Sequence, residues 1–254
     1  MLETAAGICH ASTKYRIQKS CGLLLDATFE QSDSLSAYLS RAFEVGSLAP
    51  KIVKFGEATR VEFNIFSHLE LTDEAARARH LVPMYHIEDT GGKQGVVMPC
   101  YACSLSSVDC NYKEDLDAQN LEPAFLRGTR QILTALSTLH DKGVIHNDVK
   151  PGNILIDCNG DWHLSDYGSC TCYCIQDLMT VKYTAYYCPA DFSKQRKFRR
   201  NSPAFDKMLL AVSVLDRLQL LTLQHGFTCQ QLVDSVETVA NEELKTLLRN
   251  MISF

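Results

Sequence analysis

The sequence has no apolar stretch long enough to cross a membrane, and its first residues lack the basic and apolar segments of a secretory signal. We therefore expect a cytoplasmic or nuclear protein without a membrane partner. An excess of positive charge is also missing, because 25 Lys and Arg stand against 30 Asp and Glu. Since nucleic-acid-binding surfaces concentrate basic residues, we expect no nucleic-acid partner.

Cysteine is not scarce, but the context of a disulfide-rich fold is missing. The chain has 11 Cys among 254 residues, of which 46% are hydrophobic. A chain of this size and composition can bury a core of its own, whereas disulfide frameworks are typical of small secreted domains. We expect reduced thiols and a single domain that spans residues 1–254.

A polar stretch that begins at His146 carries four groups suited to one kind of chemistry. Asp148 is a carboxylate that could orient an attacking hydroxyl and accept its proton, and Lys150 is a cation that could offset charge on a phosphoryl group. Asn153 and Asp166 offer oxygen ligands of the type that Mg²⁺ prefers. Together these groups predict magnesium-assisted phosphoryl transfer, and the alternative is a polar surface loop.

The residues between Asn153 and Asp166 predict a β-hairpin. Two short apolar runs, 154–156 and 162–164, flank the segment 157–161, which is rich in Asp, Asn and Gly. A hairpin returns its last residue to the edge where it began. We therefore expect Asn153 and Asp166 to lie side by side.

This stretch resembles the catalytic loop and metal loop of the eukaryotic-type protein kinases, whose pattern is H-R-D-x-K-x-x-N followed by D-F-G. The distances along the chain from Asp148 to Asn153 and to Asp166 agree with that pattern. The resemblance implies a bilobal α+β fold with a small β-rich N-lobe at about 1–98, a hinge at 99–102 and a shortened, mostly helical C-lobe at 103–254. It also implies ATP and Mg²⁺ as cofactors.

The N-terminal part departs from the family pattern. Residues 12–30 predict two strands around a turn, where the family has a Gly-rich loop over the phosphates. Here only Gly22 stands in that loop, and no G-x-G-x-x-G motif is present nearby. The segment 31–49 is interpreted as an insertion with a helix at 35–43.

The resemblance also assigns the residues that would bind the nucleotide. Lys54, on an apolar strand at 51–55, would hold the α- and β-phosphates and pair with Glu62 at the start of a helix at 62–69; Glu57 is the alternative partner. Two further strands are expected at 80–88 and 94–98. After them, Met98 would line the adenine pocket, and the backbone of Cys100 and Tyr101 would contact the base.

The C-terminal half predicts helices around the catalytic stretch. A long helix at 121–139 has a buried stripe, Asp206 opens another apolar helix, and about two helices follow residue 221. The resemblance implies that Asp206 braces the catalytic loop backbone. Residues 169–190 would be the activation segment, in which Cys170, Cys172 and Cys174 are interpreted as incidental thiols, with metal binding as the alternative.

Three functions are compatible with these features. The first is an active protein kinase for Ser and Thr hydroxyls of protein substrates, which Lys150 favours. The second is a pseudokinase that binds nucleotide or protein, which the missing Gly-rich loop favours. The third is a small-molecule kinase on the same fold, against which Lys150 and the segment 184–191 argue.

Asn147 gives an expectation about regulation. It stands where the family usually has the Arg that pairs with a phosphorylated activation segment, so the resemblance makes this chain a non-RD kinase. We expect activity that does not depend on phosphorylation of Thr180, Tyr183 or Thr184. Control would come instead from the geometry of Lys54 and Glu62 or from a regulatory partner protein.

Overall fold

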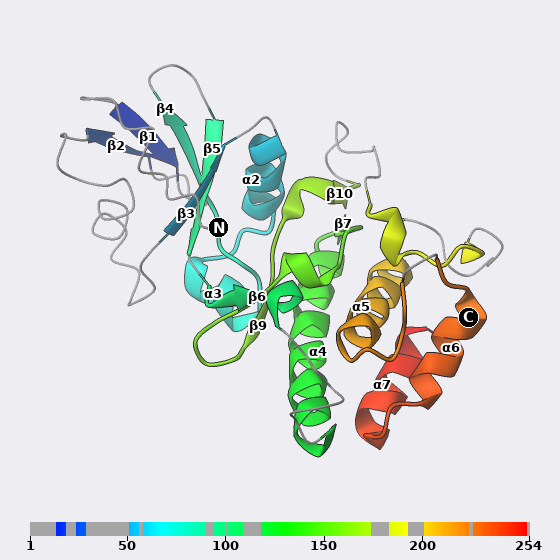
Figure 1. Cartoon of the computed structure of the whole chain (residues 1–254). Coiled ribbons are helices and arrows are strands. Elements are labelled where there is room, and N and C mark those ends of the chain that lie inside the picture. The colour runs from blue at the N-terminus through cyan, green and yellow to red at the C-terminus, as the bar shows by residue number, and fades with distance from the viewer. Residues whose placement is uncertain are drawn as a thin grey trace. The chain divides into compact units, whose positions relative to one another are not determined.

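The computed structural model describes residues 14–18, 24–28, 51–55, 58–89, 94–99, 101–108, 118–173, 183–192, 201–223 and 226–252 (Figure 1). The chain divides into two compact units. The first comprises Met1–Ala78 with Val82–Tyr101, and the second comprises Arg79–Leu81 with Ala102–Phe254. Sheet dominates the described part of the first unit and helix that of the second, as the predicted α+β class requires.

The first unit is built on a five-stranded antiparallel sheet with the strand order β2-β1-β4-β5-β3. Its strands are β1 Lys14–Gln18, β2 Leu24–Thr28, β3 Lys51–Phe55, β4 Tyr85–Asp89 and β5 Gln94–Pro99. The strands expected within residues 12–30 and at 51–55 are therefore confirmed. The connection that holds Gly22 and the segment 31–49 lie outside the described residues.

Helix α2, Ala58–His68, packs against β4 and β5 through buried apolar side chains that include Ile65 and Phe66. A short helix, α3, follows at Asp73–Ala78. The sequence placed the start of α2 at Glu62, which is wrong, since the helix already begins at Ala58. Residues 58–60 carry no apolar periodicity, so the pattern showed only the packed turns. Glu62 therefore lies inside the helix, where its side chain is fully buried.

The strand expected at 80–88 is half right. β4 begins only at Tyr85. Leu81 instead forms a parallel bridge to Leu164 in the second unit, and Leu164 N donates to His80 O at 2.8 Å. Leu81, Val82 and Met84 are all fully buried. A buried apolar run of this kind looks like a strand in sequence, whatever partner its backbone finds.

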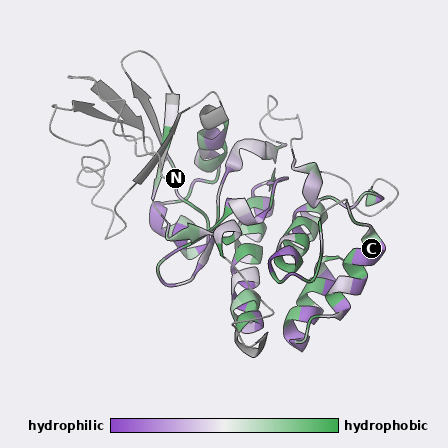
Figure 2. Cartoon of the chain, viewed as in Figure 1, coloured by the Kyte–Doolittle hydropathy of each residue, from purple (hydrophilic) through white to green (hydrophobic). Residues whose placement is uncertain are grey.

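The described part of the second unit contains the helices α4 Ala118–Asp141, α5 Pro203–Arg217, α6 Cys229–Glu237 and α7 Glu242–Met251. Helix α5 is central, because α4, α6 and α7 all pack against it and residues 208–215 are all buried. Both α4 and α5 show green, hydrophobic turns in Figure 2. The predicted helix at 121–139 and the two closing helices are confirmed. None of the described helices has the length and hydropathy that a membrane span requires.

Two small sheets position the catalytic stretch. One joins β6 Cys103–Ser104, β8 Ile154–Ile156 and β9 Trp162–Leu164 in the order β6-β8-β9. The other pairs β7 Val144–Ile145 with β10 Thr171–Cys172. Strands β8 and β9 form the predicted hairpin, with Ile154 opposite Leu164. This pairing confirms the hairpin prediction. The prediction was possible because turn residues and apolar runs specify a hairpin locally.

The hairpin rests on α4 at a glycine. Trp162 is 5% exposed, and its ring meets that of Phe125 edge to face at 5.2 Å. A Cβ atom added to Gly128 would lie 2.2 Å from a Trp162 ring carbon, so the indole occupies the space that any larger residue needs. Gln131 Oε1 accepts a hydrogen bond from Trp162 N at 2.9 Å and fixes the strand beside the helix.

We expect Gly128→Ala to destabilise the chain. Alanine favours a helix over glycine by about 0.5–1 kcal/mol, but overpacking against a buried indole costs about 1–3 kcal/mol. The clash should win and lower the free energy of unfolding, measured by urea denaturation. Gly152→Ala is the matched control, since a Cβ there meets nothing within 4 Å. Equal stability of wild type and Gly128→Ala would show that Trp162 can move aside.

Two histidines meet at the same hairpin: His163 lies on β9, and His80 precedes the bridge residue Leu81. The rings of His80 and His163 have centroids 5.5 Å apart, and His163 Nε2 lies 3.4 Å from Asp157 Oδ2. Burial lowers the pKa of both imidazoles, although the carboxylates of Asp157 and Asp161 oppose the shift; Arg127 lowers the pKa of His80 further, and His80 that of His163. Both rings therefore resist protonation in the folded chain.

We expect stability to fall as the pH drops below about 6.5, the ordinary histidine pKa. The unfolded chain takes up protons there that the folded chain refuses, so acid favours unfolding. His163→Asn removes one such site and should reduce the loss of Tm between about pH 7.5 and about pH 5.5. Asp157→Asn removes an opposing charge and should enlarge the loss. An unchanged loss in both variants would contradict the assignment.

Candidate active site

The backbone of the catalytic loop is hydrogen-bonded to one buried carboxylate on α5. Asp206 is fully buried, and its side chain accepts hydrogen bonds from His146 N at 2.9 Å and Asn147 N at 2.7 Å. His140 Nε2, from the last turn of α4, lies 2.9 Å from the same carboxylate. The sequence predicted that Asp206 braces this backbone, and the structure places it there. Because the backbone of Asn147 is held in this way, the position of the residue that follows it, Asp148, is fixed.

Both oxygens of Asp148 accept hydrogen bonds. Oδ1 accepts from Thr184 N at 2.9 Å and from the Thr184 hydroxyl at 2.6 Å. Oδ2 accepts from Lys150 Nζ at 2.7 Å and from Asn153 Nδ2 at 3.2 Å. Lys150 Nζ also donates to the Thr184 hydroxyl at 2.9 Å. Three residues that the sequence singled out, Asp148, Lys150 and Asn153, therefore form one cluster.

These donors decide the charge of Asp148. Burial opposes ionisation of the carboxyl, but hydrogen bonds from Lys150 and Thr184, with the charge of Lys150, outweigh it, so the pKa of Asp148 lies below its ordinary value. The side chain is thus an anion at neutral pH. An anion in this place can accept a proton from a hydroxyl that lies against it.

The hairpin brings Asn153 beside the residues that precede the second carboxylate. Ser165 N and the Ser165 hydroxyl both donate to Asn153 O at 2.9 Å. Asp166 follows directly, with φ 63° in the left-handed region, and accepts from Gly168 N at 3.4 Å. The Asn153 amide nitrogen donates to Asp148 O at 2.8 Å, so the amide oxygen is the atom left for a cation. Amide and carboxylate oxygens suit Mg²⁺.

Thr184 is the site residue that sequence reasoning missed. It contacts Asp148 through both its amide and its hydroxyl, across 36 residues of chain. No periodicity or turn motif links positions so far apart, and the segment 174–182 between them lies outside the described residues. The only signal in the sequence was a threonine within the expected activation segment.

The end of that segment is anchored to the start of α6. Asp191 Oδ1 accepts from Cys229 N at 2.8 Å, and Ala190 N donates to Phe227 O at 2.7 Å. The structure shows that this carboxylate reaches a helix N-terminus, where backbone N–H groups favour an anion.

The residues expected to bind nucleotide belong to the first unit. Lys54 lies on β3 and Glu62 is buried within α2. Met98 lies on β5 and is partly exposed, and Tyr101 is buried at the end of that unit. Gly22 and Cys100 lie outside the described residues. The roles of these residues stay predictions.

The cysteines expected in the activation segment are partly described. Cys170 and Cys172 are 3% and 1% exposed, and Cys174 lies outside the described residues. In the part of the chain that the structure covers, no three His, Cys, Asp or Glu side chains are grouped to hold a metal ion. Cys172 lies in β10 and Cys170 directly precedes that strand, so both side chains belong to the packed part of the second unit.

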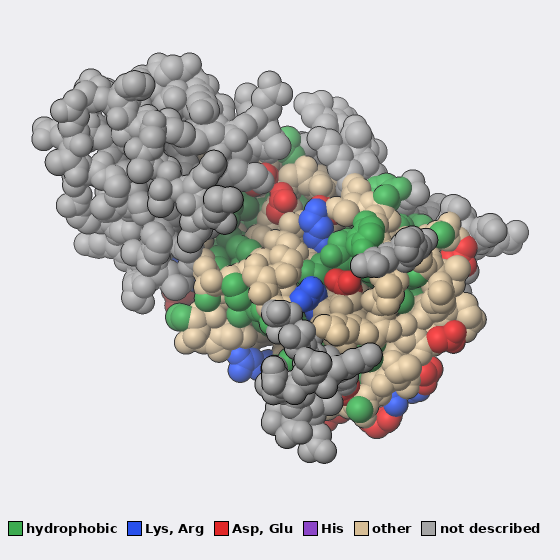
Figure 3. Space-filling view, viewed as in Figure 1, with side chains coloured by type: hydrophobic (Ala, Val, Ile, Leu, Met, Phe, Trp, Pro, Cys, Tyr) green, Lys and Arg blue, Asp and Glu red, His purple; other side chains and the backbone are tan. Residues whose placement is uncertain are grey.

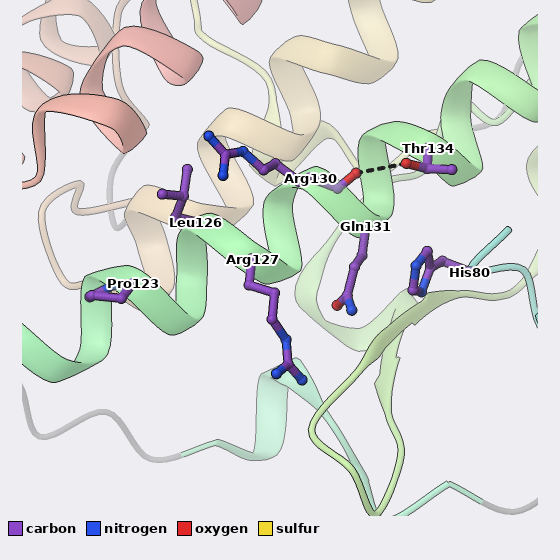
Figure 4. Close-up of a pocket in the computed structure, with 7 residues that line it drawn as sticks. All are labelled: His80, Pro123, Leu126, Arg127, Arg130, Gln131 and Thr134. Carbon is purple, nitrogen blue, oxygen red and sulfur yellow. Dashed lines mark hydrogen bonds between the residues drawn. The ribbon is translucent and has the colours of Figure 1, made fainter. Parts of the chain in front are cut away.

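A separate hollow of about 270 Å³ lies on α4 (Figure 4). Both arginines of its lining are already paired: Arg127 with Asp161 at 2.8 Å, and Arg130 with Glu243 at 2.9 Å. Figure 3 shows acidic and basic side chains scattered over one face of the described residues. The hollow contains none of the four groups expected to carry the chemistry.

Comparison with known proteins gives the family. Residues 45–252 match the family model described as protein kinase domain. A segment of 88 residues, 35% of this chain, is 35% identical to mitogen-activated protein kinase kinase kinase 3 of Arabidopsis thaliana and covers 16% of that protein. A 93-residue segment, 36% of the chain, is 31% identical to serine/threonine-protein kinase STE20 of Kluyveromyces lactis and covers 9% of it.

A third segment, of 66 residues or 26% of the chain, is 42% identical to human serine/threonine-protein kinase 10 and covers 7% of that protein. The chain thus matches only a small part of the length of these relatives. The family model, by contrast, matches most of the chain, and it includes the loop from His146 to Asn153 and the carboxylates Asp166 and Asp206. The chain therefore belongs to the protein kinase family.

Proposed function

We propose that this chain transfers the γ-phosphoryl group of ATP to serine and threonine hydroxyls of protein substrates. One observation carries the proposal: the Thr184 hydroxyl lies 2.6 Å from Asp148 Oδ1 and 2.9 Å from Lys150 Nζ. An aliphatic hydroxyl thus fits between the anion and the cation. A substrate hydroxyl needs the same two contacts as it attacks phosphorus.

In this proposal each residue of the cluster has one task. Asp148 orients the acceptor hydroxyl and takes its proton as the new O–P bond forms and ADP leaves. Its lowered pKa suits a loose transition state, in which the hydroxyl needs orientation more than a strong base. Lys150 offsets negative charge that develops on the transferred group.

Asn153 and Asp166 would hold Mg²⁺ through their side-chain oxygens. The ion, when bound, would neutralise charge on the nucleotide phosphates. Asn153 is suited to this task because its amide nitrogen is oriented by Asp148 O. Asp166 is suited because its left-handed backbone and the Gly168 amide hold its carboxylate at the end of the hairpin.

Nucleotide binding is assigned by family resemblance. Lys54, paired with Glu62, would anchor the α- and β-phosphates, and the turn with Gly22 would lie over them. Met98 and the backbone of Cys100 and Tyr101 would contact adenine. The proposed setting is the cytoplasm or nucleus, with protein substrates and a regulatory protein as partners.

A second candidate is a pseudokinase that binds without turnover. The contacts that Thr184 and Lys150 make to both oxygens of Asp148 favour it, since a substrate hydroxyl must displace one of them. The missing Gly-rich loop favours it as well. Turnover of ATP separates the two functions. A small-molecule alcohol kinase is the remaining alternative, and a comparison of peptide and sugar acceptors separates it.

We expect Asp148→Asn to lower kcat by at least about 10²-fold, the usual contribution of a general base, with little change in ATP affinity. Asp166→Asn should instead weaken binding of MgATP as well as abolish transfer, because it removes a metal ligand. Both are measured with labelled ATP on a Ser/Thr peptide mixture, together with nucleotide affinity by calorimetry.

Lys245→Gln is a control outside the site, because Lys245 lies on α7 and pairs with Glu242. It should behave like the wild type. Wild-type turnover in Asp148→Asn would rule out the assigned base. Magnesium-dependent nucleotide binding without any turnover in the wild type would favour the pseudokinase.

Thr184→Val should shift the pH dependence of turnover. The substitution removes one of the hydrogen bonds that hold the pKa of Asp148 down, so that pKa should rise. The acid limb of the kcat/KM profile, which reports groups of the free enzyme, should then move to higher pH, since the carboxylate becomes protonated earlier. Thr184→Ser keeps the hydroxyl and should retain the wild-type profile. If the acid limb is the same in all three proteins, Thr184 does not control the pKa of Asp148.

A further inference from the structure

Asn147, one residue before Asp148, has an unusually connected side chain. It is fully buried, and its amide nitrogen lies within hydrogen-bonding distance of four acceptors in three segments. Two are backbone carbonyls, Ile145 O and Ser169 O, each at 3.3 Å. The others are the Thr171 hydroxyl at 3.1 Å and Asn201 Oδ1 at 3.4 Å.

The backbone of Asn147 is held as firmly as its side chain. Its φ is 65°, in the left-handed region that asparagine tolerates better than most residues. Its N–H donates to Asp206 Oδ1 at 2.7 Å. The residue therefore turns the chain toward Asp148 while its amide reaches across to other segments.

Those segments are joined to one another as well. Strand β10 pairs with β7, with Thr171 opposite Ile145. The Thr171 hydroxyl donates to Asn201 Oδ1, and Asn201 immediately precedes the N-cap residue of α5. Asn147, Thr171 and Asn201 thus form a polar latch between the catalytic loop, the start of the activation segment and the start of α5.

The latch is electrically neutral. The four acceptors around the amide are carbonyls, a hydroxyl and a side-chain amide, and Asp206 already accepts from two backbone amides and faces His140. Among the described residues, none donates a hydrogen bond to the buried Oδ1 of Asn147. The contacts that the structure describes around Asn147 offer a cation no free counter-charge and an anion no donor, so either charge would be costly to bury there.

We propose that Asn147 is a positioning residue whose amide fixes the catalytic loop to β10 and Asn201, so that the position of Asp148 does not depend on a phosphorylated activation segment. The inference rests on the proposed kinase activity for its functional part. Its structural part concerns only the latch and can be tested without turnover.

Asn147→Gly is the direct test, because glycine accepts a φ of 65° and lacks the side-chain amide. In the full chain, peptides covering residues 144–148 and 170–173 should exchange backbone hydrogen at least tenfold faster than in the wild type. Peptides from α5 should not, which separates local opening from global unfolding. Asn201→Gly, whose φ is 62°, should act in the same way.

Gln219→Gly is the matched control, since Gln219 is exposed and has a positive φ of 55° outside the latch. It should leave exchange and turnover as in the wild type. In an active wild type, Asn147→Gly should lower kcat at least tenfold with an unchanged KM for ATP. Phosphatase treatment of the wild type should leave the initial rate unchanged.

Three results would overturn the inference. Unchanged exchange in Asn147→Gly would show that the amide holds nothing in place. A tenfold loss of rate after phosphatase treatment would show that a phosphate positions the loop. An unaltered kcat in Asn147→Gly would separate the latch from the site. A wild type without turnover would refute the proposed function instead, and the exchange experiment would still decide whether the latch exists.

Discussion

The site depends on one buried charge. Asp206 sits on α5 with no exposed surface, which is costly for a carboxylate unless donors surround it. Two successive backbone amides, His146 N and Asn147 N, supply those donors, and His140 lies at the same oxygen as His146 N. The need to satisfy this carboxylate and the need to fix the catalytic loop are met by the same hydrogen bonds. Because α5 is packed among three other helices, these hydrogen bonds attach the loop to the packed core.

From that anchor, order is transmitted outward through polar contacts. Asp148 accepts hydrogen bonds from Lys150 and Asn153 of its own loop and from Thr184 of a distant segment. At the end of the β8–β9 hairpin, the Ser165 hydroxyl donates to the backbone carbonyl of Asn153, and Asp166 follows Ser165. Few of these bonds join neighbouring residues, so the cluster exists only in the folded chain. The orientation of the Asp148 side chain is therefore set by the tertiary fold.

The sequence predicted what is encoded locally. The hairpin and helix α4 follow from turn residues and helical periodicity, and both are confirmed; a short motif singled out Asp148 and Asn153, which lie in contact. Local patterns also produced the errors: the apolar residues at 81–84 resemble a strand, although β4 begins only at Tyr85 and Leu81 bridges to Leu164. Thr184 and Asn201 were not predicted, because their contacts cross 36 and 54 residues. Only the tertiary fold specifies such pairs.

The packing of Trp162 against Gly128 has a practical consequence. Trp162 is the one tryptophan of the chain, and it lies buried on the hairpin that carries Asn153 and Asp166. Indole emission shifts to longer wavelength when water reaches the ring. Intrinsic tryptophan fluorescence of this protein therefore reports the second unit alone, and within it the joint between α4 and the hairpin. The molecule carries its own optical probe beside the site, without any label.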